Sequence, residues 1–316
     1  MNVPLYALLT LSQPEYIAPG VKFRGDIGKG GALMLVIHEN ETNEVSKAAP
    51  LISNILVPVN FSKRSVRAAS FALRLARRFD AKITLLHVER PIEGDVYWNL
   101  ETAWWAKEQI ANLLESKGKA DVQRIVSLNS DIAEEILHVA ATTGADLIVM
   151  PTRGAGTIRR ALLGSIAAKV LRDATCPVWT SAHVELEPTT NPLKPARILC
   201  AANSVTDDSG AVTKDSMVLS WASHLASELC GSLYVAWSPE ATSETREEVD
   251  RLERTYQISA EQVAAVGNVP DALRHAAAAV RADLLVINRN FERSPEQPAF
   301  DTYQVVRESP CPVVSM

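Results

Sequence analysis

One segment of the chain gathers glycines, a serine and a basic side chain in the manner of a phosphate-binding loop. Arg153 and Gly154 precede Gly156, and Gly164 stands directly before Ser165 at the start of a helix-like stretch. Glycine lets backbone amides approach an anion closely, and the first amides of a helix attract negative charge. The Ser165 hydroxyl is expected to cap that helix and to reach a phosphate. An ordinary capped helix behind a glycine-rich loop has the same residue types, so these residues alone leave both interpretations open.

Strands and helices in alternation must position this segment. Short apolar runs, typical of strands buried on both faces, are separated by stretches with apolar residues at helical spacing. We expect strands near 54–59, 82–88, 124–128, 146–150 and 177–181, and helices near 65–79, 104–114, 132–143 and from 164 onward.

This order predicts an α/β fold with a doubly wound, five-stranded, Rossmann-like parallel sheet. In such sheets, ligands bind beyond the carboxyl ends of the strands, where the strand order reverses. The loop after the first strand, Pro58-Val59-Asn60, is therefore expected to face the glycine-rich loop across one site.

The same pattern occurs twice along the chain. The stretch around His138 that leads to Ala145–Val149 recurs 137 positions later, around His275 and Ala282–Val286. Later on, a Cys-Pro-Val sequence at 176–178 returns at 311–313. Between the copies, three prolines at positions 188, 192 and 195 exclude a continuous helix or central strand. We therefore predict two tandem domains, with their boundary in this segment.

The predicted organisation has four parts. Residues 1–50 form an extension without an assigned role, which we expect to be loosely structured around a short apolar run at 33–37. The first domain spans 51–184, a proline-rich linker spans 185–195, and the second domain spans 196–316. The second copy is shorter between its second and fourth strands.

Composition excludes several classes of protein. The 316 residues carry a net charge of −5, so neither nucleic acid nor an anionic membrane is an expected partner. No apolar stretch approaches the roughly 18 residues of a membrane span, and no secretory signal is recognisable. The four cysteines form no C-x-x-C pair, which favours a reduced setting. We expect a cytoplasmic protein.

The spacing of Gly154, nine residues and Gly164-Ser165 resembles the end of the G-x2-G-x9-G-[ST] signature of the universal stress protein (UspA-like) family. Segments 55–62, 85–88, 145–150 and 170–178 resemble strands and a helix that frame this signature in the family. The resemblance is good over about 52–182 and weaker over about 196–316. It implies that the terminal strands of the two domains pair within the chain as a pseudo-dimer, and a homodimer also remains compatible with it.

In the nucleotide-binding branch of this family, the resemblance implies an ATP site in the first domain, with Mg²⁺ as the counter-ion. The residues expected near the adenine are Pro58, Val59, Asn60 and Val88. Those expected along the sugar and the phosphates are Met150, Arg153, Gly154, Gly164, Ser165 and Ile166.

This chain departs from the family pattern at three places. Asn60 replaces the usual acidic residue, although its amide offers both a donor and an acceptor. Pro151 replaces the first glycine of the signature and removes one amide N–H. In the second domain, residues 288–298 contain no glycine, so we expect that domain to bind no ATP and to have an architectural role.

The leading hypothesis is a stress-response module that binds an adenine nucleotide in its first domain. One alternative is a tandem scaffold or protein-interaction module that has lost nucleotide binding. A nucleotide-processing enzyme is a third, but no residue is identified as catalytic, and hydrolysis would at most be slow. The paired His138 and His275 lack recurring Cys, Asp or Glu partners, so no metal site is predicted.

Overall fold

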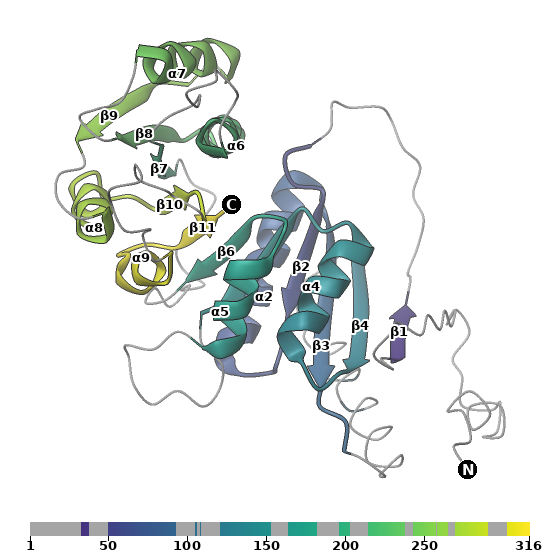
Figure 1. Cartoon of the computed structure of the whole chain (residues 1–316). Helices are drawn as coiled ribbons and strands as arrows, with labels where there is room; N and C mark the ends of the chain where they lie inside the picture. Colours follow the sequence, from purple (N-terminus) through teal and green to yellow (C-terminus); the bar gives the residue numbers. More distant parts are fainter. Residues whose placement is uncertain are drawn as a thin grey trace.

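A single mixed sheet organises the protein. The computed structural model describes residues 33–37, 50–92, 105, 108, 121–152, 164–181, 196–202, 214–237, 243–256, 258–264, 269–289 and 302–316. In these residues, 11 strands lie in the order β1-β4-β3-β2-β5-β6-β11-β10-β7-β8-β9, and Figure 1 shows helices on both faces of this sheet. The fold is α/β, and most neighbouring strands are parallel.

The first half of the sheet confirms the predicted strands and the helices predicted at 65–79, at 132–143 and from 164 onward, whereas all but two residues of the helix predicted at 104–114 lie outside the described residues. Its parallel strands are β2 (Asn54–Pro58), β3 (Lys82–Glu89), β4 (Val122–Leu128), β5 (Leu147–Pro151) and β6 (Val178–Ser181). The helices between them are α2 (Lys63–Phe79), α4 (Ile132–Thr143) and α5 (Ser165–Asp173). The chain runs from β2 outward to β3 and β4, and then crosses back to β5 on the other side of β2. The strand order therefore reverses between β2 and β5.

The expectation of a loosely structured N-terminal extension is wrong for one segment. Strand β1 (Leu33–Ile37) lies at the edge of the sheet and pairs antiparallel with β4, from Leu33 opposite Leu128 to Ile37 opposite Arg124. A run of five apolar residues matches the pleat of a neighbouring strand, and pairing satisfies the backbone groups that an edge strand would leave open.

The second half repeats the strand order of the first. Its strands are β7 (Arg197–Ala201), β8 (Ser232–Trp237), β9 (Ala260–Ala264), β10 (Leu284–Ile287) and β11 (Val313–Ser315). Its helices are α6 (Lys214–Glu228), α7 (Ser243–Tyr256), α8 (Val269–Ala279) and α9 (Thr302–Glu308). The sequence patterns indicated neither α7 nor β9. Helix α7 was missed because it is strongly polar and buries only a narrow face around Val249 and Leu252.

One backbone hydrogen bond has a counterpart in the other half of the sheet. The amide of Ile148 donates to the carbonyl of Pro177 over 2.9 Å, and the amide of Leu285 donates to that of Pro312 over 2.9 Å. These residues occupy the same positions in the two copies of the sequence pattern.

Strands β6 and β11 join the two halves. They pair antiparallel, with Val313 opposite Thr180 and Val314 opposite Trp179. Along each central strand, successive side chains point to opposite faces, so that Ile55 and Val57 enter one core cluster and Leu56 the other. Helices α2, α6 and α7 cover the first cluster, while α4, α5, α8 and α9 cover the second. Each core therefore runs continuously beneath both halves.

Within the described residues, no helix combines the length and the apolar character that crossing a membrane requires.

The four cysteines should react in a defined order. Cys230 is exposed, whereas burial raises the pKa of the Cys176 and Cys311 thiols to about 11 each and also raises that of the fully buried Cys200. At pH 8 roughly one thiol in a thousand with a pKa of 11 is the reactive thiolate. We expect a thiol reagent to modify one cysteine per native chain, Cys230, and four after denaturation. Cys230→Ser should abolish the native reaction, and fast modification of a second cysteine would contradict this packing.

Candidate functional site

A cavity of about 280 Å³ opens at the carboxyl ends of β2, β3 and β5, beside the point where the strand order reverses. It lies between the start of α4 and the start of α5. Eight of the residues expected from the sequence line it together: Pro58, Val59, Asn60, Val88, Met150, Gly164, Ser165 and Ile166. The other two, Arg153 and Gly154, lie outside the described residues.

Seven further residues line the cavity: Ser65, Leu86, Ile132, Ile136, Pro151, Thr152 and Ala167. Ile132 and Ile136 stand one turn apart on α4, a spacing that was readable in the sequence as one face of a helix. Ser65 carried no comparable signal, because only the folded turn after β2 brings its hydroxyl under the cavity. The cavity is therefore mostly apolar, with a few hydroxyl and amide groups, as is usual for small-molecule sites.

The turn after β2 fixes the direction in which Asn60 can interact. Its Oδ1 accepts hydrogen bonds from the amide (3.2 Å) and the hydroxyl (2.7 Å) of Ser62. The next residue, Phe61, adopts a left-handed backbone conformation with φ of 57°. Because the oxygen is used inside the turn, the NH₂ group of Asn60 is the part of the side chain that can meet a ligand, as a donor.

The side chain of His87 holds this turn through the backbone of Val59. Its Nδ1 lies 2.8 Å from the carbonyl oxygen of Val59, and its Nε2 lies 3.2 Å from a carboxylate oxygen of Glu89. Since a carbonyl can only accept, Nδ1 carries a proton in this arrangement. The Phe61 ring covers the imidazole at 4.7 Å between ring centroids. His87 is thus a buried support of the loop and does not line the cavity.

The expectation that Ser165 caps α5 is wrong. Gly164 is the N-cap, with φ of −68° and ψ of 144°, and it provides no side-chain hydrogen bond to the helix. Its own amide donates to the carbonyl of Thr152 over 2.9 Å, which ties the start of α5 to the end of β5. Ser165 is instead the first helical residue and is exposed. The amides of the first turn, without a side-chain cap, border the cavity with the positive end of the helix dipole.

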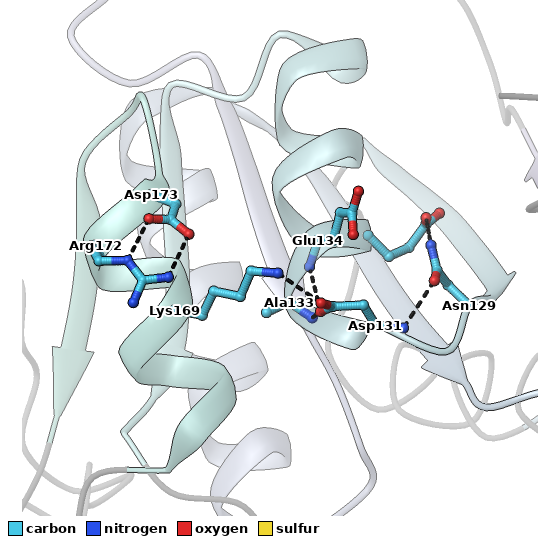
Figure 2. Close-up of polar contacts among 8 residues, drawn as sticks. Asn129, Asp131, Ala133, Glu134, Lys169, Arg172 and Asp173 are labelled. Atoms are coloured by element: carbon cyan, nitrogen blue, oxygen red, sulfur yellow. Dashed lines mark hydrogen bonds and ion pairs between the residues drawn. The ribbon is translucent and has the colours of Figure 1, made fainter. Parts of the chain in front are cut away.

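Polar contacts fix α4 and α5 to each other, as Figure 2 shows. Asp131 caps α4 by accepting from the amides of Ala133 and Glu134, each over 3.0 Å. The same carboxylate accepts from the Lys169 ammonium of α5 over 2.7 Å. This one hydrogen bond lowers the pKa of the Asp131 carboxyl and raises the pKa of the Lys169 ammonium. The two helices that border the cavity are therefore held at a set separation.

A buried carboxylate connects the N-terminal end of α4 to β4. Glu135 is 2% exposed and accepts from the Ser127 hydroxyl over 2.6 Å and from the Asn129 side chain over 2.8 Å. Asn129 in turn accepts from the amide of Asp131 over 3.0 Å. These bonds link the end of β4 to the cap of α4.

The described lining of the cavity carries no ionisable side chain. It contains no histidine and no acidic side chain that could act as a general base. His138 on α4 and His275 on α8 are both exposed, and the described residues contain no group of three His, Cys, Asp or Glu side chains that could hold a metal.

The equivalent place in the second half is occupied by a buried polar pair. Asp215 at the start of α6 accepts from the Asn288 side chain over 2.9 Å, and both residues are buried. Asn288 follows β10, at the position that Pro151 has in the first copy. A carboxylate at this place opposes a phosphate, whereas the first half has the Ser65 hydroxyl at the start of α2.

Removal of the Asp131 side chain should destabilise the protein in a pH-dependent way. Because its pKa is lowered on folding, its stabilising contribution is present above the ordinary Asp range and is lost as the pH falls through the lowered value. We expect Asp131→Ala to cost about 1 kcal/mol of unfolding free energy at pH 7, measured by urea denaturation. The difference from wild type should shrink below a pH of about 4. Asp131→Asn keeps a capping oxygen and should cost less, and an equal cost for both variants would refute the capping role.

Comparison with known proteins places the first half in a family. The model of the universal stress protein family matches residues 52–181. A universal stress protein of Methanocaldococcus jannaschii is 32% identical over 141 residues, which cover 40% of this chain and 81% of that protein. One from Thermus aquaticus is 32% identical over 135 residues, which cover 40% of this chain and 97% of that protein.

The similarity of fold extends further along the chain. The crystal structure of a universal stress protein from Archaeoglobus fulgidus superposes with a TM-score of 0.60 at 20% identity, covering 83% of this chain and 95% of that one. At this identity, the likeness concerns the fold alone. The sequence relatives, the family model and the arrangement of the sheet agree, and the chain belongs to the universal stress protein family.

Proposed function

We propose that this chain is a stress-response module of the cytoplasm that binds an adenine nucleotide, ATP with Mg²⁺ as its counter-ion, in residues 51–184. The observation that carries the proposal is the cavity at the reversal of strand order, where eight expected residues meet beside the start of α5. The adenine would lie between the turn at Val59 and Asn60 and the side chain of Val88. The phosphates would lie at the amides of Gly164, Ser165 and Ile166, with Arg153 and Gly154 completing the loop.

Residues 196–316 act, in this proposal, as a second UspA-like domain that no longer binds nucleotide. The repeated strand order and the antiparallel β6–β11 pairing support an intramolecular pseudo-dimer, with 185–195 as the linker between the domains. The buried Asp215–Asn288 pair supports the loss of binding, because it puts an acidic group where the cavity of the first half has the neutral residues Ser65 and Pro151. One nucleotide per chain is therefore the proposed stoichiometry.

The proposed role is binding, with hydrolysis slow at most. A mostly apolar cavity can hold a nucleotide and transmit its presence, and none of its described lining residues carries a histidine or carboxylate side chain that would activate water. We expect the bound nucleotide to act as a signal.

Isothermal titration of the full chain with ATP and Mg²⁺ tests the proposal. We expect saturable binding of one nucleotide per chain. Gly164→Val should abolish it, because the added side chain lies at the start of α5 within the cavity wall. Ala141→Val adds similar bulk at an exposed position of α4 and should bind like the wild type. Absence of heat from the wild-type protein at tens of micromolar would refute nucleotide binding.

The second candidate function is a tandem scaffold that has lost nucleotide binding, and Pro151 is the observation that favours it. Proline lines the cavity at the end of β5 where the signature has glycine, so one amide N–H is missing.

Pro151→Gly therefore separates the two functions. If the site binds ATP, restoring one hydrogen bond should raise the affinity about two- to tenfold in the same titration. Pro151→Ala, which also restores an amide but keeps a Cβ, serves as the matched variant. If neither the wild type nor these variants bind, the scaffold function stands.

A further inference from the structure

The two ends of helix α5 are held by different parts of the protein. Its first turn borders the cavity and lacks a side-chain cap. At its other end, the last carbonyl groups of a helix have no partner within the helix and carry the negative end of the dipole. The C-cap residue of α5 is Ala174, which is buried, so its carbonyl needs a partner from elsewhere in the protein.

Arg289 of the second half supplies that partner. Its guanidinium donates to the carbonyl of Ala174 and, over 2.5 Å, to the carbonyl of Cys176. It also donates to the carbonyl of Ser315 in β11 over 2.9 Å. Burial lowers the pKa of Arg289, but an arginine starts so far above neutrality that it stays charged. A cation from one half thus caps the C-terminal end of a helix in the other.

A second contact reaches the middle of the same helix. The hydroxyl of Tyr303, on α9, donates to the carbonyl of Ala168 over 2.6 Å. Thr302, the first residue of α9, contacts Arg289 as well, because its hydroxyl donates to the Arg289 carbonyl over 2.7 Å. Arg289, Thr302 and Tyr303 therefore form one connected group from the second half that contacts α5.

A different contact joins the two halves on the opposite face of the sheet. There, Arg78 of α2 donates to the carbonyl of Glu228 on α6. That contact joins the halves without touching α5. Its removal is therefore a matched control for the effect of weakening contacts between the halves in general.

We propose that Arg289 and Tyr303 are positioning residues for the candidate phosphate site, so that nucleotide binding at the start of α5 is thermodynamically coupled to the pairing of the two halves. The inference rests on the proposed function. It gives the second half an active role, because this half sets the position of α5 and responds to occupancy of a site that none of its described residues lines. By linkage, a nucleotide that binds better to the fixed α5 must in turn stabilise the contacts that fix it.

The test uses the full chain with Arg289→Met, which keeps a long apolar stem and removes the donors, and Tyr303→Phe, which removes one hydroxyl. By titration with ATP and Mg²⁺, we expect affinity to fall about tenfold for Arg289→Met and about threefold for Tyr303→Phe. Arg78→Met, the matched control, should stay within about twofold of wild type. Circular dichroism and thermal unfolding establish whether each variant is folded. If Arg289→Met does not fold, Tyr303→Phe, which removes a single hydroxyl, still tests the inference.

Hydrogen exchange gives a readout that does not depend on affinity. In nucleotide-free protein, exchange in Ser165–Asp173 should be faster in Arg289→Met than in wild type or Arg78→Met. In wild type, added ATP and Mg²⁺ should slow exchange in Val313–Ser315, and this response should be lost in Arg289→Met.

The outcomes separate the inference from the proposed function. If the wild type binds ATP but Arg289→Met and Tyr303→Phe bind it equally well, the coupling is refuted and the nucleotide site stands. If the wild type binds no ATP, the proposed function fails, and the coupling to a nucleotide fails with it. Unchanged exchange in α5 of Arg289→Met would refute the positioning role in either case.

Discussion

The reversal of strand order between β2 and β5 is the constraint on which the rest of the structure depends. Because β3 and β5 flank β2 on opposite sides, α2, which follows β2, and α5, which follows β5, cover opposite faces of the sheet, and the chain diverges at the ends of these two strands. The divergence opens the cavity, brings the Val59–Asn60 turn opposite the start of α5, and leaves the first amides of that helix facing it. The supporting contacts follow from this geometry: His87 holds the turn, and the Asp131–Lys169 pair holds α4 against α5.

Strong local patterns made most of the fold predictable from the sequence. The helix at 132–143 begins after a capping aspartate and ends before Gly144, whose φ of 65° suits a C-cap, so both of its ends agree with the prediction. Where the pattern is weak, prediction failed. Helix α7 has too narrow an apolar face to show periodicity, and β1 becomes a strand only because the edge of β4 offers a partner that no local pattern reveals.

The candidate site was predictable as a set of residues but not in its contacts. Spacing and resemblance brought together Pro58, Val88 and Gly164, because a loop motif and strand ends are local features of sequence. The direction of the Asn60 amide depends on the turn to Ser62, and the missing cap at Ser165 depends on the backbone of Gly164. Arg289 could not have been assigned a role from sequence, since its partners at the end of α5, Ala174 and Cys176, lie 115 and 113 residues away in the other half.

In the proposed function, residues 51–184 bind a nucleotide, and residues 196–316 hold the helix that would contact its phosphates. The most direct measurement is the amount of ATP that the purified chain binds at equilibrium, in dialysis against a saturating concentration of ATP with Mg²⁺. We expect one equivalent of ATP per chain. Binding of none would contradict the site in the first half, and binding of two would contradict the loss of binding in the second.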